Sequence, residues 1–310
     1  MRPFPGTPTV FRLHIRGRTD KQSENTHALE AACALMVARV MKNDAGRAGM
    51  MKITVVQWSP SFGKKQLNWA RMEEFSRRCD SDIIVFPELY SSGYNFDSRE
   101  EIIPHSDTAA ALSNLAEISA GDGKLIVGGF SELDGRHVFD SAFAISDGKT
   151  GIYRKIHLWA KETQIFDEGS ESLIVTHGGA KVGIEICYDL QFPELARLML
   201  SGGADIILCP MAWAEEPTYM DRETPSFVHL AIAQSFSNGV FTAIANRVGT
   251  ERGAVFEGHS GVADPYGNFS GLKRGEGEIT VEMDLSAVEK ARRPNVYNNL
   301  DKDRRLKVSL

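Results

Sequence analysis

The sequence has few cysteines, and none of them stands in a disulfide or metal-binding pattern. Cys33, Cys79, Cys187 and Cys209 lie far apart and form no CxxC or Cys/His spacing. This pattern argues against a disulfide framework and a structural zinc site, and it favours a reducing, cytoplasmic setting. The sequence also has no HExxH motif or clustered His/Asp set, so we expect no metal and no cofactor.

Long apolar runs and an excess of basic charge are absent as well. The longest apolar candidate, residues 31–37, is far shorter than the roughly 20 residues that cross a bilayer. The formal net charge is -6, and residues 1–50 are basic, so residues 51–310 are more acidic still. An acidic main body argues against nucleic acid or an anionic membrane as a partner.

Residues 1–50 differ in character from the rest of the chain. They begin with a proline-rich stretch and continue with Arg12, Arg16 and Arg18. A transit peptide would be poor in acidic residues, yet acids interrupt this segment. We therefore expect residues 1–50 to be an accessory extension and residues 51–310 to form one domain.

Strand-like and helix-like patterns alternate along residues 51–310, which indicates an α/β protein with a mixed sheet. Asp134-Gly135 and Asp147-Gly148 predict hairpins. The expected strands are 52–58, 82–86, 124–129, 138–145, 172–176, 181–187, 205–209, 240–245, 260–263 and 278–283, and the expected helices are 66–79, 109–120, 193–201 and 221–237.

One internal echo suggests how the strands are divided. Residues 81–90 read SDIIVFPELY and residues 204–213 read ADIILCPMAW. Each stretch describes a buried strand that ends at a proline-led loop. Two pseudo-equivalent halves, each with its own sheet, predict a four-layer αββα sandwich. Cys209 aligns with Phe86 inside the strand, so we assign it to the core.

Three residues, Cys187, Glu88 and Lys155, lie at positions that suit catalysis. Cys187 ends a strand pattern just before Pro193 opens a helix, and backbone N–H groups at such an elbow favour a thiolate and can hold an oxyanion. Glu88 follows a buried strand and Pro87, a place that suits a general base. Lys155 lies in an apolar segment and, if buried near a thiolate, would stabilise it.

The stretches around these residues resemble the three motif blocks of the nitrilase superfamily of carbon–nitrogen hydrolases. They read FPELYSSGYNF, YRKIHLW and GIEICYDLQFPELAR, in that order along the chain. The stretches GGFSE, NRVG and FEGHSGVADPYG add further matches, and the resemblance covers about residues 51–305.

The resemblance implies a role for each residue. Cys187 would be the nucleophile, Glu88 the base, and Lys155 a stabiliser of the tetrahedral intermediate, with help from the Tyr188 backbone N–H. Glu132, matched to the second glutamate of the family, would hold Lys155 or the substrate. The resemblance also implies at least a homodimer built on helical faces.

Other residues near these motifs are candidates for weaker roles. Tyr94, Trp159, Tyr188 and Trp213 are expected to line the substrate pocket. We interpret His157 as structural, and Asp189 and Arg197 as braces of the elbow. Asp140 stands where family members often have Asn, and Glu185 shares a strand face with Cys187, where it would be costly if buried without a partner.

The expected activity is hydrolysis of a small amide or N-carbamoyl compound, because Tyr188-Asp189 resembles the amidase-type branches. One alternative is a nitrilase that acts on a small nitrile. Another is a catalytically silent binding member of the same fold.

Overall fold

The computed structural model describes residues 49–106, 109–214, 224–272 and 274–293. The strands are β1 (Met50–Gln57), β2 (Ile83–Val85), β3 (Leu125–Asp134), β4 (His137–Ser146), β5 (Lys149–Arg154), β6 (Leu173–His177), β7 (Ala180–Ile184), β8 (Ile206–Met211), β9 (Phe241–Asn246), β10 (Val248–Glu251), β11 (Ala254–Glu257), β12 (Gly261–Ala263), β13 (Phe269–Gly271) and β14 (Gly277–Asp284). The helices are α2 (Lys65–Arg78), α3 (Arg99–Ile102), α4 (Ala109–Asp122), α5 (Glu162–Ile165), α6 (Pro193–Ser201), α7 (Ser226–Asn238) and α8 (Ser286–Arg292), with 3-10 turns η1 (Ile103–His105) and η2 (Cys187–Gln191).

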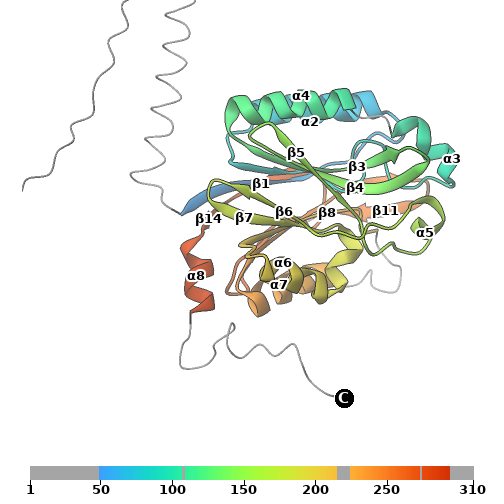
Figure 1. Ribbon diagram of the computed structural model, residues 1–310. Coiled ribbons are helices and arrows are strands. Elements are labelled where there is room, and N and C mark those ends of the chain that lie inside the picture. Colours follow the sequence, from blue (N-terminus) through green and yellow to red (C-terminus); the bar gives the residue numbers. More distant parts are fainter. Residues whose placement is uncertain (1–48, 107–108, 215–223, 273, 294–310) are drawn as a thin grey trace, which may run out of the picture. The chain divides into compact units, whose positions relative to one another are not determined.

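Two six-stranded sheets lie face to face between helices. One sheet has the order β14-β1-β2-β3-β4-β5, the other the order β13-β12-β9-β8-β7-β6, and β10 and β11 form a separate hairpin. Figure 1 shows α2 and α4 on the outer face of the first sheet, and α6 and α7 on the outer face of the second. The expected αββα sandwich is therefore confirmed.

The apolar pattern of β2 explains why it lies inside this arrangement. Ile83 and Val85 belong to the core cluster that contains residues of both sheets. Ile84 belongs instead to the cluster that packs against α2 and α4. Successive side chains of a strand point to opposite faces, so a strand covered on both sides must be apolar at every position.

The two halves of the sequence echo become equivalent central strands. β2 pairs in parallel with β1 and β3, and β8 pairs in parallel with β7 and β9. The loops after these strands meet, because the Glu88 backbone N–H donates to the Met211 carbonyl at 3.3 Å. Glu88 and Met211 hold equivalent places in the two echo stretches, so the loops that end the two repeats come together where the sheets face each other.

Most expected elements are present, with shifted ends. The 3.6-residue pattern at 193–201 gives α6 with the predicted bounds. The strand expected at 124–129 runs on to Asp134, because it pairs along its whole length with β4 in the hairpin that Asp134-Gly135 predicted. The strand expected at 181–187 ends earlier, at Ile184, so Cys187 lies in η2 rather than in β7.

Some expectations concern residues outside the described ranges. The first residues of the helix expected at 221–237 fall there, and the described helix α7 begins at Ser226. The idea that residues 1–50 form an accessory extension stays a prediction, because the description starts at residue 49. None of the described helices is long and apolar enough to cross a membrane.

Gly129 on β3 lets the strand approach the loop that carries Glu88. A Cβ atom at Gly129 would lie 2.3 Å from the Leu89 backbone nitrogen and 2.4 Å from the Glu88 Cα atom. The Gly129 N–H also donates to the Pro87 carbonyl at 2.9 Å. The close approach of these two backbones fixes where the Glu88 loop lies.

We therefore expect Gly129→Ala to destabilise the protein. The added methyl group has to displace backbone rather than a flexible side chain, and overpacking of this kind costs about 1–3 kcal/mol in the free energy of unfolding. Urea unfolding measures the difference. Gly121→Ala in α4 is the matched control, because a Cβ there meets no atom within 4 Å; equal stability of the two variants would contradict the explanation.

Candidate active site

Glu88 is anchored in the loop after β2 by the facing loop of the second sheet. Its side chain is fully buried. Oε2 accepts a hydrogen bond from the Ala212 backbone N–H at 2.6 Å, and Oε1 lies 2.6 Å from the Lys155 ammonium. The carboxylate is thus held from two directions before any substrate arrives.

Lys155 follows β5 and is also fully buried. Its ammonium contacts both oxygens of Glu162, at 2.9 and 2.8 Å, in addition to Glu88, and Asp140 Oδ2 lies 3.3 Å away. Burial alone lowers the pKa of Lys155, but the charges of Glu162 and Glu88 outweigh burial and raise that pKa well above its usual range. Lys155 is therefore a fixed positive charge.

Glu162 is a member of this site that the sequence analysis did not single out. It stands at the start of α5 and accepts hydrogen bonds from the Trp159 backbone N–H at 2.7 Å and from the Tyr94 hydroxyl. These contacts direct both of its oxygens toward Lys155. The signal in the sequence that could have identified Glu162 is its position, seven residues after Lys155 and three residues after Trp159.

Glu132 pairs with Arg154 rather than with Lys155, and the alternative expectation, that Glu132 holds the substrate, stays a prediction. Glu132 accepts hydrogen bonds from the Arg154 guanidinium, at 2.9 Å from Nε and 2.5 Å from Nη2, and from the Ser141 hydroxyl at 2.7 Å. Arg154 and Lys155 are adjacent in sequence, so their side chains leave the chain on opposite sides. Glu132 therefore pairs with Arg154, which lies outside the buried cluster, and Glu162 pairs with Lys155.

Cys187 opens η2 with a φ of 45°, a left-handed conformation that is strained for a residue with a Cβ. Its side chain is buried. Burial, followed by the charge of Glu88, raises the pKa of its thiol well above its usual range, although Lys155 acts in the opposite sense. Burial therefore opposes the thiolate that the elbow was expected to favour, and Lys155 supports it.

Asp189 holds the strained turn in place, as expected. It accepts hydrogen bonds from the Ile186 backbone N–H at 3.0 Å, from the Tyr153 hydroxyl at 2.8 Å and from His157, through both its backbone N–H and its ring Nδ1. The His157 ring also stacks on Phe192 at 3.8 Å, which fits its interpretation as structural. Arg197 is exposed on α6, so Asp189 does the bracing.

Glu185 has a hydrogen-bond partner in the structure, and the sequence alone did not reveal it. Its Oε1 accepts a hydrogen bond from Gln234 on α7 at 2.9 Å. Burial raises the pKa of Glu185 to about 8, with a smaller opposing effect from Gln234. A carboxyl group whose pKa is raised on folding stabilises the protein most in acid, and that stability is lost as the pH rises toward 8.

The four expected pocket residues lie around the cluster in different ways. Tyr94 is buried and bonded to Glu162, whereas Trp159 is 42% exposed. Tyr188 is half-buried on η2 with its ring edge-on to Phe192, and Trp213 packs against Phe227 after β8. Their contacts with substrate stay a prediction.

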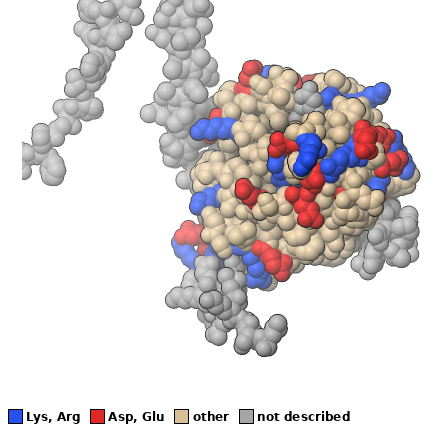
Figure 2. Space-filling model, turned by 45° about the vertical axis from the view of Figure 1, so that its right-hand side comes forward, with Lys and Arg blue, Asp and Glu red and all other residues tan. Residues whose placement is uncertain are grey.

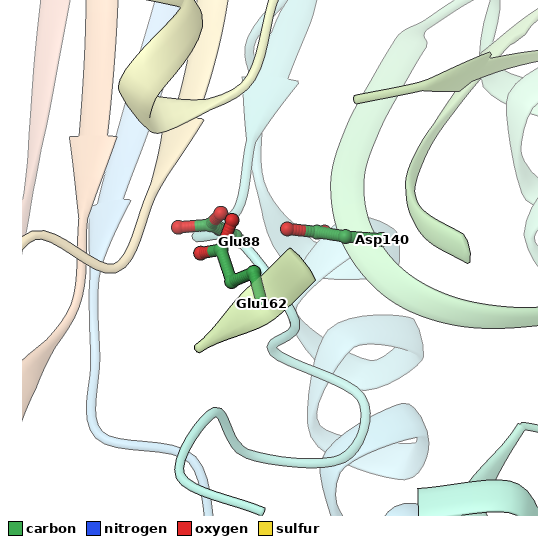
Figure 3. Close-up of side chains that lie close together, drawn as sticks. All are labelled: Glu88, Asp140 and Glu162. Carbon is green, nitrogen blue, oxygen red and sulfur yellow. The ribbon is translucent and has the colours of Figure 1, made fainter. Parts of the chain in front are cut away.

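Three carboxyl groups converge in the site. Figure 3 shows Glu88, Asp140 and Glu162 pointing toward one another, and one oxygen of each lies within 4.8 Å of the others. Such a set could bind a cation. The Lys155 ammonium already contacts all three residues, so a metal ion placed among them would have to displace it.

A buried acid, a lysine and a cysteine lie where the loops of the two sheets meet, and a family model shows which family the chain belongs to. The model described as carbon-nitrogen hydrolase matches residues 52–293. The chain belongs to the carbon–nitrogen hydrolase family. This hydrolase is 35% identical over 269 residues to a protein named nitrilase from Pyrococcus abyssi, with 83% of this chain and 98% of that one covered.

Other relatives point to amide chemistry. The hydrolase is 32% identical to an (R)-stereoselective amidase from a Pseudomonas species, over 84% of this chain and 93% of that protein. Among solved structures, an amidase of the nitrilase superfamily from Nesterenkonia aligns with a TM-score of 0.66 and 25% identity, over 80% of this chain and 95% of that one. The protein is a carbon–nitrogen hydrolase of the amidase-like branch, a class that acts on small amides or nitriles.

A matched pair of variants distinguishes the two glutamates. We expect Glu162→Gln to lower turnover at least about 100-fold, because Lys155 then loses a charged partner and shifts in the site. Glu132→Gln should keep turnover, because it weakens only the partly exposed pair with Arg154. Steady-state kinetics measure both, with thermal unfolding as the check that each variant folds. Loss of turnover in Glu132→Gln with retention in Glu162→Gln would reverse the assignment.

Proposed function

We propose that the protein hydrolyses a small linear amide or N-carbamoyl compound through a thioester on Cys187. The observation that carries the proposal is the Lys155 ammonium 2.6 Å from the Glu88 carboxylate, with both charges acting on the Cys187 thiol. A buried thiol beside a preorganised carboxylate and a fixed ammonium has the parts that acyl transfer needs.

In the proposed reaction, Glu88 removes the thiol proton as the sulfur attacks the substrate carbon. The carbonyl oxygen gains negative charge, which Lys155 and the Tyr188 backbone N–H stabilise. The C–N bond then breaks, and the leaving ammonia or amine takes the proton from Glu88. Glu88 next removes a proton from water, which attacks the thioester carbon. The C–S bond then breaks, the acid leaves, and Glu88 returns the proton to the sulfur of Cys187.

Relatives that are named for their activity support this reaction class. One is a 2-oxoglutaramate amidase from Bacillus subtilis and another an omega-amidase from Saccharomyces cerevisiae. The Nesterenkonia amidase has been solved with the acetamide moiety of fluoroacetamide added covalently at its active-site cysteine. These names favour an amide over a nitrile as the substrate.

The surface near α3 and α5 carries charges of both signs. Figure 2 shows side chains of both signs close together on the face toward α3 and α5. The ion pairs of this region include Arg99–Asp167, Arg252–Glu101 and Lys161–Asp97. Adjacent charges of opposite sign leave no strong field of one sign, so this surface would not steer a charged substrate.

A screen for ammonia release over small amides, N-carbamoyl compounds and nitriles tests the proposal. We expect turnover with an amide or carbamoyl compound, none with Cys187→Ala, and a loss of about 10²–10³-fold with Lys155→Ala. Because Lys155→Ala leaves buried acids without their cation, its folding is checked by thermal unfolding.

The alternatives give different results in the same screen. Turnover of nitriles alone would identify a nitrilase. Protection of Cys187 from iodoacetamide by a compound that is never hydrolysed would identify a binding protein. Near-normal turnover by Cys187→Ala would contradict the mechanism. Assembly as a homodimer or larger oligomer also stays a prediction, which sedimentation of the full chain can test.

A further inference from the structure

Asp140 is a third acid in the cluster, and the proposed reaction does not use it. It lies on β4, paired across the sheet with Ser131 on β3. Its side chain is fully buried, and neither carboxyl oxygen has a hydrogen-bond partner among the described residues. A buried charge in that situation is costly, so its protonation state needs an explanation.

The distances show which of the three acids is least bound to the lysine. Glu88 and Glu162 lie at 2.6 and 2.8 Å from the Lys155 ammonium, whereas Asp140 lies at 3.3 Å. If all three acids were ionised, one ammonium would face three negative charges away from water. A single proton relieves much of this repulsion, and it costs least on the acid with the weakest contact to the cation.

Burial and the neighbouring acids favour the protonated form of Asp140, and Lys155 opposes them. Burial, followed by the charge of Glu88, raises the pKa of Asp140 well above the usual range, and Glu162 adds to the effect while Lys155 opposes it. The other titratable groups of the cluster are Cys187 in η2 and Tyr94 in the loop after β2. Among the described residues that act on the pKa of Asp140 in this cluster, Lys155 is the cation.

We propose that Asp140 is a positioning residue that stays protonated and directs its O–H toward the Glu88 carboxylate. This inference rests on the proposed function. The proton remains on Asp140 through the whole cycle, so no step gains or loses it. Its effect is to leave Glu88 and Glu162 as the two charged partners of Lys155 and to hold Glu88 in line for the Cys187 thiol.

The proposal predicts a specific failure in alkali. When Asp140 loses its proton, it becomes a third buried negative charge and no longer donates to Glu88. Both changes disfavour negative charge on the Cys187 sulfur. Asp140→Asn keeps an N–H donor that cannot ionise, whereas Asp140→Leu has a similar size and no donor.

The first experiment needs no substrate. The full-length wild type, Asp140→Asn and Asp140→Leu are treated with iodoacetamide from pH 6 to pH 10, and the alkylation rate of the Cys187 peptide is followed by mass spectrometry. We expect the ratio of the Asp140→Asn rate to the wild-type rate to rise at least about fivefold across this range. Asp134→Asn, an exposed carboxylate on the same hairpin, is the control and should give a constant ratio. A constant ratio for Asp140→Asn together with the same ratio for Asp140→Leu would overturn the proposal, because the donated hydrogen bond would then have no effect on the Cys187 thiol.

The second experiment uses whichever substrate the ammonia screen identifies. We expect Asp140→Leu to lower kcat at least tenfold with KM changed less than threefold, and Asp140→Asn to recover most of that loss and to extend the pH profile of kcat/KM in alkali. Equal kcat values for the Asn and Leu variants would overturn the proposal. If no substrate is found, the proposed hydrolysis fails, while the alkylation ratio still decides the role of Asp140.

Discussion

A lysine ammonium that has no contact with solvent connects the acidic residues of the candidate active site. Lys155 binds Glu88 from the loop after β2 and Glu162 from α5, and it lies beside Asp140 on β4. Buried charges of this kind are stable only when each has partners at close range. The fold supplies them by bringing four separate segments to one point, so the ion pairs and the fold depend on each other.

The two sheets make this convergence possible. Each contains a central apolar strand that ends in a proline-containing stretch, and the two ends meet through the bonds from Glu88 to Met211 and Ala212. The strained turn at Cys187 is held by Asp189, which also binds Tyr153 of β5. Contacts with the backbone therefore fix Glu88 and the turn that carries Cys187 before a substrate binds. Electrostatic catalysis requires this kind of preorganisation.

Much of this arrangement was predictable from the sequence because it follows from local patterns. Apolar runs located the central strands, Pro193 and Glu194 located the start of α6, and the echo of residues 81–90 in 204–213 predicted two sheets. The motif blocks pointed to Glu88, Lys155 and Cys187. The choice between Glu132 and Glu162 was not predictable in the same way, because Glu162 lies near Lys155 in sequence and Glu132 lies two strands away in the same sheet. Only the direction of the Arg154 and Lys155 side chains decides which acid binds which cation. The missed strands are β5, β10, β11 and β13. β5 follows the hairpin that Asp147-Gly148 predicted and pairs with β4, whereas β10, β11 and β13 are short and have little apolar alternation, so tertiary pairing rather than local preference forms them.

The central claim is that the sulfur of Cys187 becomes covalently bound to the acyl part of the substrate. Rapid acid quenching of the wild-type protein during turnover of a small amide, followed by mass spectrometry of its peptides, tests this claim most directly. The account predicts an added mass equal to the acyl group on the peptide that contains Cys187. Ammonia release with no such adduct at any quench time, or with the acyl group on another residue, would contradict it.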